Sequence, residues 1–199
     1  KDACGNVMRG LLVAGMAMNA AGCSRPASGM EHYISHIIDM RSLAFGTPAE
    51  LHGIQCALAT LVTVRSYKKL AGITPDREKA LAYVQSFYPD KWFSHLREKL
   101  GAGAEAMIAG EAREHKYDKE KHRARLERII SRWDEINAVI DEMPSPDDLE
   151  ALIRRTGLPV APEEIGISDD DLHEAFIMAK DIRDKYVLGR LLWDLGLLA

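Results

Sequence analysis

The sequence predicts an all-α protein, a helical bundle that occupies residues 1–199 as one domain. Apolar residues recur at three- and four-residue spacing along almost the whole chain, which is the pattern of helices that bury one face. No segment shows the sustained alternation of apolar and polar residues that a half-buried strand requires. A hydrophobic fraction of 47% and a charged fraction of 28% are those of an ordinary globular protein.

The first helix is expected over residues 5–21. The segment Val7–Cys23 is largely apolar and ends in Ala-Ala-Gly-Cys, a pattern that resembles a lipoprotein signal. Arg9 and Asn19 interrupt the apolar run, however, and Asp2 lies where a signal would be basic. We therefore favour a buried helix over a signal, and the segment is too short and too interrupted for a membrane span.

Two capping patterns predict the starts of the next helices. Ser28–Glu31 has the form of a capping box that opens the second helix. Thr47–Glu50 repeats the pattern, with Pro48 at the first helical position. The third helix is expected to run to about Leu70, and its middle, residues 57–62, is apolar on nearly every side, so it should be central and buried.

The rest of the chain is also predicted to be helical. The expected segments are two short helices over 76–101 broken at Tyr88-Pro89, a long charged stretch over 104–142, a short helix over 147–155, and a last helix that Ser168 caps through Asp171 and that reaches Leu198 with its continuation.

Three histidines form the most informative local pattern. His32 and His36 lie four residues apart on the second helix and share one face. His52 lies near the start of the third helix, so two antiparallel neighbours would aim His32 and His52 at one point. Neutral imidazoles on rigid helices suit a divalent zinc, iron or nickel ion. The alternative is that these rings are hydrogen-bonded within a packed helix interface.

The residues around the histidines resemble a known family. The stretch CSRPASGMEHYISH over 23–36, followed by LHGIQ over 51–55, is similar to the helical-domain signature of the glycerol-1-phosphate dehydrogenases, especially their bacterial branch. Residues 164–168 and 181–186 also resemble that branch. These enzymes belong to the superfamily of iron-containing alcohol dehydrogenases, glycerol dehydrogenases and dehydroquinate synthases. The resemblance implies the C-terminal domain of a dehydroquinate-synthase-like two-domain enzyme, whose N-terminal Rossmann-like nucleotide domain is absent from this chain.

The resemblance also implies roles for the histidines. His32 and His52 match two ligands of the divalent metal, which is zinc, nickel or iron, and His36 matches a catalytic position close to substrate and nicotinamide. The third ligand of the family is an aspartate expected upstream of Lys1, without a match here. The implied reaction interconverts dihydroxyacetone phosphate and sn-glycerol 1-phosphate, with NAD or NADP bound through the absent domain. By itself the chain is expected to be inactive.

The substrate phosphate needs a binding group as well. Ser24, Arg25 and Ser28 precede the second helix, where free N–H groups and the positive end of the helix dipole favour an anion. The alternative is that Ser28 only caps the helix and Arg25 pairs with a carboxylate.

Charge and cysteine usage restrict the partners. A net charge of −4 provides no general attraction for nucleic acid or anionic lipid, and the basic run 113–132 is interleaved with acids, as in a solvated helix face. Cys4, Cys23 and Cys56 are interpreted as reduced thiols of a cytoplasmic protein. The expected partner is a small phosphorylated substrate, with no nucleic acid and no membrane, and with homo-oligomerisation at full length.

Three other functions stay open at this point. The first is a glycerol or other polyol dehydrogenase, the second is a lyase like dehydroquinate synthase, and the third is a non-catalytic helical interaction module. The loop SRPASG over 24–29 favours a glycerol-1-phosphate dehydrogenase over the first two of these functions.

Overall fold

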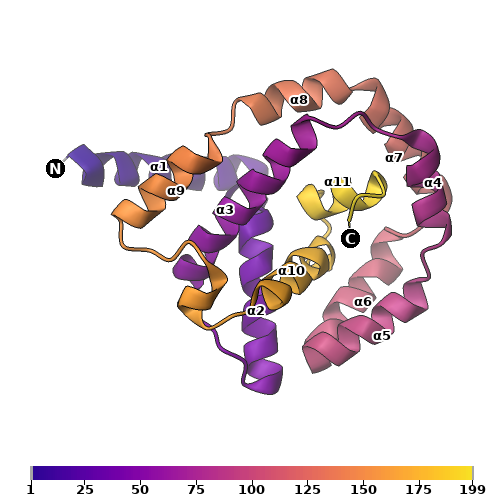
Figure 1. Cartoon of the computed structure of the whole chain (residues 1–199), viewed down its shortest axis with the longest axis horizontal. Coiled ribbons are helices and arrows are strands. Elements are labelled where there is room, and N and C mark those ends of the chain that lie inside the picture. The colour runs from indigo at the N-terminus through magenta and orange to yellow at the C-terminus, as the bar shows by residue number, and fades with distance from the viewer. Residues whose placement is uncertain (1, 199) are drawn as a thin grey trace.

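The computed structural model describes residues 2–198 and confirms the all-α prediction, because that range contains helices and turns but no strand. The α-helices are α1 (Asp2–Ala21), α2 (Met30–Phe45), α3 (His52–Ala71), α4 (Arg77–Gln85), α5 (Pro89–Leu100), α6 (Ala104–Glu114), α7 (Lys119–Ser131), α8 (Trp133–Asp141), α9 (Pro146–Arg155), α10 (Asp169–Met178) and α11 (Leu188–Asp194). Four short 3₁₀ turns join them: η1 (Arg25–Ala27), η2 (Gly101–Gly103), η3 (Pro162–Ile165) and η4 (Ala179–Asp181). Figure 1 shows their arrangement.

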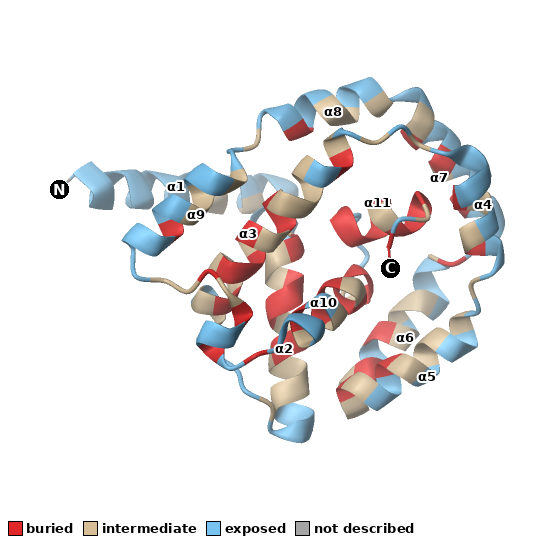
Figure 2. Ribbon diagram, in the orientation of Figure 1, coloured by how far each residue is buried: buried red, intermediate tan, exposed pale blue. Residues whose placement is uncertain are grey.

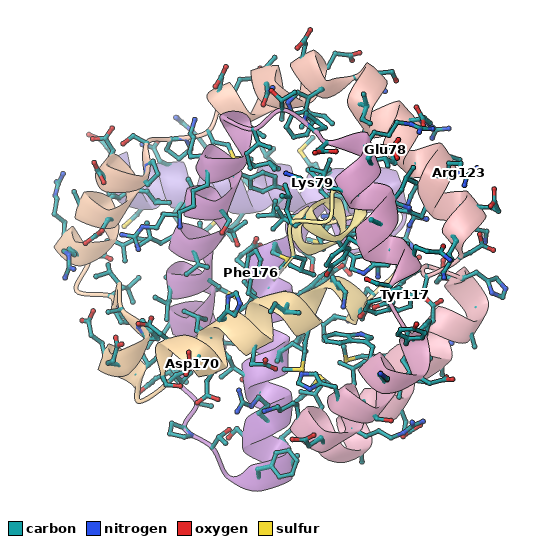
Figure 3. The ribbon with its side chains drawn as sticks, turned by 45° about the vertical axis from the view of Figure 1, so that its right-hand side comes forward. Glu78, Lys79, Tyr117, Arg123, Asp170 and Phe176 are labelled. Atoms are coloured by element: carbon teal, nitrogen blue, oxygen red, sulfur yellow. The ribbon has the colours of Figure 1, made fainter. Side chains whose placement is uncertain are left out.

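The centre of the molecule is built on α2 and α3, which pack against each other, while α10 packs on α2 (Figure 1). Leu58, Ala59 and Leu61 are buried, which confirms the predicted central position of residues 57–62. Helix α11 contacts α4, α7 and η4, and its Trp193 is fully buried. On α10, Asp170 lies at the outer end, whereas the buried Phe176 lies toward the middle of the molecule (Figure 3).

The prediction that the first helix is buried is wrong. The helix forms, but none of the described residues of α1 is buried (Figure 2). Its large apolar side chains other than the half-buried Met18 are 57–71% exposed. The main contact of α1 is with the adjacent turn η1, so no other element covers its apolar side chains. Periodicity predicts a helix, but burial also requires a neighbouring surface. No helix within residues 2–198 combines the length and the apolar content that a membrane span requires.

Both predicted capping boxes are corrected. Helix α2 begins at Met30, with Gly29 as N-cap, and the carboxylate of Glu31 accepts the Gly29 N–H at 3.0 Å. Helix α3 begins only at His52, so Thr47–Glu50 belongs to a loop without helix. Thr47 and Pro48 line a small cavity together with residues 166–167. Nε2 of Gln55 donates to the Glu50 carbonyl at 2.6 Å, so a side chain of α3 holds the end of this loop where the local pattern predicts a helix.

Two further predicted helices are subdivided. The stretch 104–142 consists of α6, α7 and α8, with His115 in the left-handed conformation (φ 51°) after α6. Ser168 caps α10 as predicted, because its Oγ accepts the Asp171 N–H at 3.1 Å. That helix does not continue to Leu198, since residues 182–187 form no helix between η4 and α11. The two short helices over 76–101 and the helix over 147–155 are confirmed, with boundaries shifted by one or two residues.

Candidate metal and substrate site

The candidate site lies where α2 and the start of α3 pack side by side. Ser35, His36 and Asp39 lie three, four and seven residues after His32 on α2, so their side chains share one face with it. Gly46 ends α2 in the left-handed conformation (φ 68°), and its N–H donates to the Ser42 carbonyl at 2.8 Å. Glycine adopts this conformation without strain, and the chain then reverses.

The reversal brings three imidazole rings together. Nε2 of His52 lies 3.0 Å from Nδ1 of His32. The ring centroids are 4.4 Å apart for His32 and His36, 4.7 Å for His32 and His52, and 5.4 Å for His36 and His52. The two predicted metal ligands and the predicted catalytic histidine therefore form one cluster.

A hydrogen-bond chain orients the ring of His52. The Ser35 hydroxyl donates to Oε1 of Gln55 at 2.9 Å and lies 2.7 Å from Nδ1 of His52. Since the hydroxyl proton is directed at Gln55, Ser35 accepts the proton carried by Nδ1. Asp39 lies on the same edge of the ring, with Oδ2 3.3 Å from Nδ1. Nε2 is then the unprotonated nitrogen of His52, and it faces His32.

Burial and neighbouring charges keep the other two rings neutral. Burial lowers the pKa of His32, and the adjacent His52 and Arg183 lower it further. Burial also lowers the pKa of His36, with additional contributions from His32, His52 and Arg183. Nε2 of His36 is buried and has no hydrogen-bond partner among the described residues. Neutral imidazoles with free nitrogens are the form that binds a metal.

Two sets of ligand atoms are close enough to surround one ion. His32, His52 and Cys56 form the first set, and His36, Asp39 and His52 form the second; within each, the ligand atoms lie within 4.8 Å of one another. Imidazole, thiolate and carboxylate ligands are those of zinc and related divalent metals, so this donor set fits the implied ion.

Sequence reasoning missed Asp39 and Cys56. The signal was present, because Cys56 follows His52 by four residues and Asp39 follows His36 by three, which places each pair on one helix face.

The three predicted phosphate-binding residues lie on the loop before α2. Arg25 pairs with Asp184, which is the alternative that the sequence left open. Nζ of Lys185 donates to the carbonyl oxygens of Arg25 at 2.8 Å and Ser28 at 2.7 Å. Ser24 precedes η1, and its side chain caps nothing there. The loop is thereby attached to residues 184–185, and the neighbouring Arg183 lies close enough for its charge to act on His32 and His36.

Comparison with known proteins gives a consistent result. The chain is 39% identical over 180 residues to the NAD(P)+ glycerol-1-phosphate dehydrogenase of Bacillus velezensis, which covers 90% of this chain and 33% of that protein. The enzyme of the same name from Bacillus subtilis is 27% identical over 179 residues, again 90% of this chain and 33% of the relative. That from Korarchaeum cryptofilum is 45% identical over 56 residues, 28% of this chain and 18% of the relative.

This chain is a relative of the glycerol-1-phosphate dehydrogenases. The resemblance noted in the sequence is thus confirmed, and the chain spans about a third of the length of the Bacillus relatives. No protein-family model matches the chain. No solved structure matches it either.

This relative of the dehydrogenases also contains a buried network of charges that sequence reasoning missed. Asp181 accepts hydrogen bonds from four side chains, namely Trp92 Nε1 at 2.8 Å, Tyr117 OH at 2.5 Å, Lys180 Nζ at 2.8 Å and an Arg190 guanidinium nitrogen at 2.6 Å. Lys180, Asp181 and Arg190 are each at most 5% exposed. Tyr117, labelled in Figure 3, lies on the segment between α6 and α7.

Electrostatics within this network favour the ion pairs. Burial raises the pKa of Asp181, but Lys180 and Arg190 outweigh burial and hold that pKa well below its usual range. Burial lowers the pKa of Lys180 to about 8, although Asp181 opposes the effect. Nζ of Lys180 also lies 3.6 Å from the ring centroid of Trp92, a cation–π contact. The network joins η4 to α11, and Arg183 follows Asp181 by two residues in the chain.

Proposed function

We propose that this chain forms the metal- and substrate-binding part of an NAD(P)-dependent oxidoreductase that interconverts dihydroxyacetone phosphate and sn-glycerol 1-phosphate. The observation that carries the proposal is the cluster of His32, His36 and His52, in a chain 39% identical to a glycerol-1-phosphate dehydrogenase over 180 residues. The names of the relatives favour this substrate over an unphosphorylated polyol.

The roles of the histidines follow from their surroundings. His32 and His52 would hold the divalent ion, His52 through the nitrogen that Ser35 and Asp39 leave free. A bound ion would polarise the substrate ketone and stabilise the negative charge that develops on its oxygen. His36, kept neutral by burial, would orient the substrate and exchange a proton with its oxygen.

Residues 182–187 would supply positive charge for the substrate phosphate. Arg25 is paired with Asp184, whereas Arg183 and Lys185 belong to the same loop and approach the N-terminal end of α2. An anion at this end of α2 would also meet the positive end of the helix dipole. Binding of Ser24, Arg25 and Ser28 to the phosphate is part of this proposal.

The reaction is tested in a chimera, because the chain spans a third of its relatives. The matching 180 residues of the Bacillus velezensis enzyme are replaced by this chain, and NADH oxidation is followed with dihydroxyacetone phosphate. We expect metal-dependent turnover that dihydroxyacetone without phosphate does not support. A folded, metal-loaded chimera that turns over only unphosphorylated substrates, or none, would overturn the proposed function. The chain alone is expected to bind neither NADH nor NADPH at sub-millimolar concentration in calorimetry.

Variants of the chimera separate the three histidine roles. His32→Ala and His52→Ala should each remove the metal and abolish turnover. His36→Ala should leave the metal bound and slow turnover by about 10²–10⁴-fold, the range for a lost acid–base group. The exposed His173 provides the control, since His173→Ala should change neither quantity. If His36→Ala loses metal while His32→Ala retains it, the assignment of roles along α2 is wrong.

A further inference from the structure

A cavity of about 160 Å³ lies beside the buried network of Asp181, between the α6–α7 segment, the loop 182–187 and α11. Five of its eight lining residues are basic and two are acidic: Lys116, Arg125, Lys180, Lys185 and Arg190 against Glu114 and Asp184. Neither the three clustered histidines nor residues 24–28 belong to this lining. Since a water molecule takes up about 30 Å³ in the liquid, the cavity has room for a small tetrahedral ion.

The carboxylates around the cavity are engaged elsewhere or exposed. Asp184 pairs with Arg25, and Asp194 accepts two hydrogen bonds from the Arg125 guanidinium, both at 2.9 Å. Glu114 is exposed at the end of α6. Within residues 2–198, none of these three carboxylates forms an ion pair with the two basic side chains that are buried.

Those two side chains, Lys180 and Arg190, are only 2% and 4% exposed, and both are paired with Asp181. Asp181 already accepts four hydrogen bonds, which fills the about four acceptor sites of an ionised carboxylate. Nη1 of Arg190 is buried and has no hydrogen-bond partner among the described residues. The guanidinium packs against the ring of Tyr117 (labelled in Figure 3), whose centroid lies 4.9 Å from Cζ. A buried N–H without an acceptor is costly, so Arg190 has capacity for one further acceptor.

The basic side chains also act on one another. The pKa of Lys180 is lowered to about 8, chiefly by burial and also by the charges of Arg190 and Lys116, although Asp181 opposes the effect. Burial likewise lowers the pKa of Lys116, and Arg190 contributes in the same direction against Asp181. Three neighbouring cations therefore share one carboxylate, and an anion bound among them would stabilise the protonated form of both lysines.

We propose that this cavity binds a small oxyanion of the phosphate type, held by Arg190, Lys180 and Lys116. A guanidinium offers such an oxygen a directional donor, and the two lysines supply compact positive charges. The bound anion would tie the α6–α7 segment to η4 and α11. The inference goes beyond the proposed dehydrogenase function and does not depend on it, because it involves neither the metal nor the loop before α2.

Tryptophan fluorescence gives a local test in the full chain, in the presence of chelator. Nζ of Lys180 lies 3.6 Å from the ring centroid of Trp92, and Cζ of Arg190 lies 5.1 Å from that of Trp193. Trp133→Phe therefore leaves two tryptophans that both contact cations of the cavity. We expect a saturable change in their fluorescence with inorganic phosphate, and none with chloride at the same ionic strength.

A parallel titration with sn-glycerol 1-phosphate distinguishes the two sources of a phosphate group. Saturation by phosphate alone identifies the free ion as the ligand, and saturation by both shows that the cavity also accepts the phosphate group of an ester. Either result supports the inference. If neither compound changes the fluorescence, the inference is wrong.

Substitutions in the same background identify the binding residues. Lys180→Met and Lys116→Met should each weaken phosphate binding by about 10-fold or more, as expected for one lost charge-assisted hydrogen bond. Lys119→Met is the matched control, because Lys119 donates to the Gln85 carbonyl as Lys116 donates to that of Arg183. This control should bind phosphate as the unmodified chain does.

Arg183→Met separates the cavity from the end of α2, where the substrate phosphate is proposed to bind. This variant should retain the fluorescence change. Phosphate binding that survives both lysine substitutions, or that Arg183→Met weakens as much as they do, overturns the inference and leaves the proposed function untouched. If Lys180→Met does not fold, the half-buried Lys116 decides alone, and unchanged binding in Lys116→Met overturns the inference.

Discussion

Asp181 is held by partners from three separate parts of the chain. Trp92 lies on α5, Tyr117 precedes α7, and Arg190 lies on α11, while Lys180 is its neighbour in sequence. Two buried cations depend on this one carboxylate. Removing one partner of a buried pair leaves uncompensated charge, which is more damaging than the pair itself is stabilising.

We therefore expect Asp181→Asn to destabilise the fold by about 3–5 kcal/mol, although asparagine has nearly the same shape. The measurement is the free energy of unfolding from urea denaturation at pH 7. Tyr117→Phe, which removes one hydrogen bond from an uncharged donor to the same carboxylate, should destabilise less, by about 1.5–3 kcal/mol.

The control is an ion pair of the same type on the surface. Arg132 and Glu135 are both more than 60% exposed, and surface pairs contribute little, so Glu135→Gln should leave the urea midpoint unchanged.

The pH dependence of the free energy of unfolding is a second check. Because the pKa of Asp181 is lowered in the folded state, its contribution persists above its usual value of 3.8 and is lost as the pH falls below that value. If the free energy of unfolding of the unmodified chain falls no faster below this pH than that of Asp181→Asn, the assignment is wrong.

Among the helices, α11 shows how a short element is held in place. It has seven residues, and Gly196 follows it with φ 70°. A Cβ at this position would lie 3.0 Å from Cβ of Tyr83 and 3.2 Å from Cα of Ala80, both on α4. A glycine is therefore required here for two reasons: it adopts the left-handed conformation without strain, and its lack of a Cβ lets the end of α11 approach α4 closely.

Gly196→Ala should consequently destabilise more than Gly22→Ala. Both glycines are left-handed, but a Cβ on Gly22 (φ 63°) would meet nothing within 4 Å. The backbone strain is common to both, and overpacking adds about 1–3 kcal/mol at Gly196 alone. Thermal unfolding of the two variants measures the difference. Equal losses would show that α11 does not pack closely on α4.

Helix α1 stands at the opposite extreme. It has 20 residues, more than α11, yet its described side chains contribute nothing to the buried core. The two helices differ in their neighbours: α11 is surrounded by η4, α4 and α7, whereas α1 chiefly contacts the turn that follows it. Length and apolar periodicity are therefore poor guides to which helix is central.

At the scale of the whole molecule, the candidate metal site couples chemistry to stability. His32 lies on α2 and His52 on α3, the pair of helices around which the core is assembled. Unfolding would separate these two histidines and release an ion bound between them. Any ligand that binds only the folded state stabilises it by an amount that grows with the logarithm of its concentration over its dissociation constant.

Zinc at 100 times its dissociation constant should therefore raise the free energy of unfolding by about 2.7 kcal/mol relative to the chain in chelator. Urea denaturation with and without zinc measures this. His52→Ala should abolish the gain, and His173→Ala should preserve it. A gain that persists in His52→Ala would show that zinc binds elsewhere.

Features that depend on residues a few positions apart could be predicted without the structure. The all-α class, the cap of Ser168, the break at Tyr88-Pro89 and the shared face of His32 and His36 all follow from helical periodicity and local capping. The short sequence motifs around these histidines also indicated the resemblance to the dehydrogenases.

Which distant groups meet depends on how the helices pack. Ser35, Asp39 and Cys56 become relevant because α2 and α3 pack in one register, which places them around His52. No local pattern indicates that Lys180 and Arg190 are buried, and in the fold each is paired with the buried Asp181. The exposure of α1 and the loop at 47–50 were mispredicted for the same reason. Burial and charge pairing are properties of surfaces brought together by folding, and local patterns do not specify them.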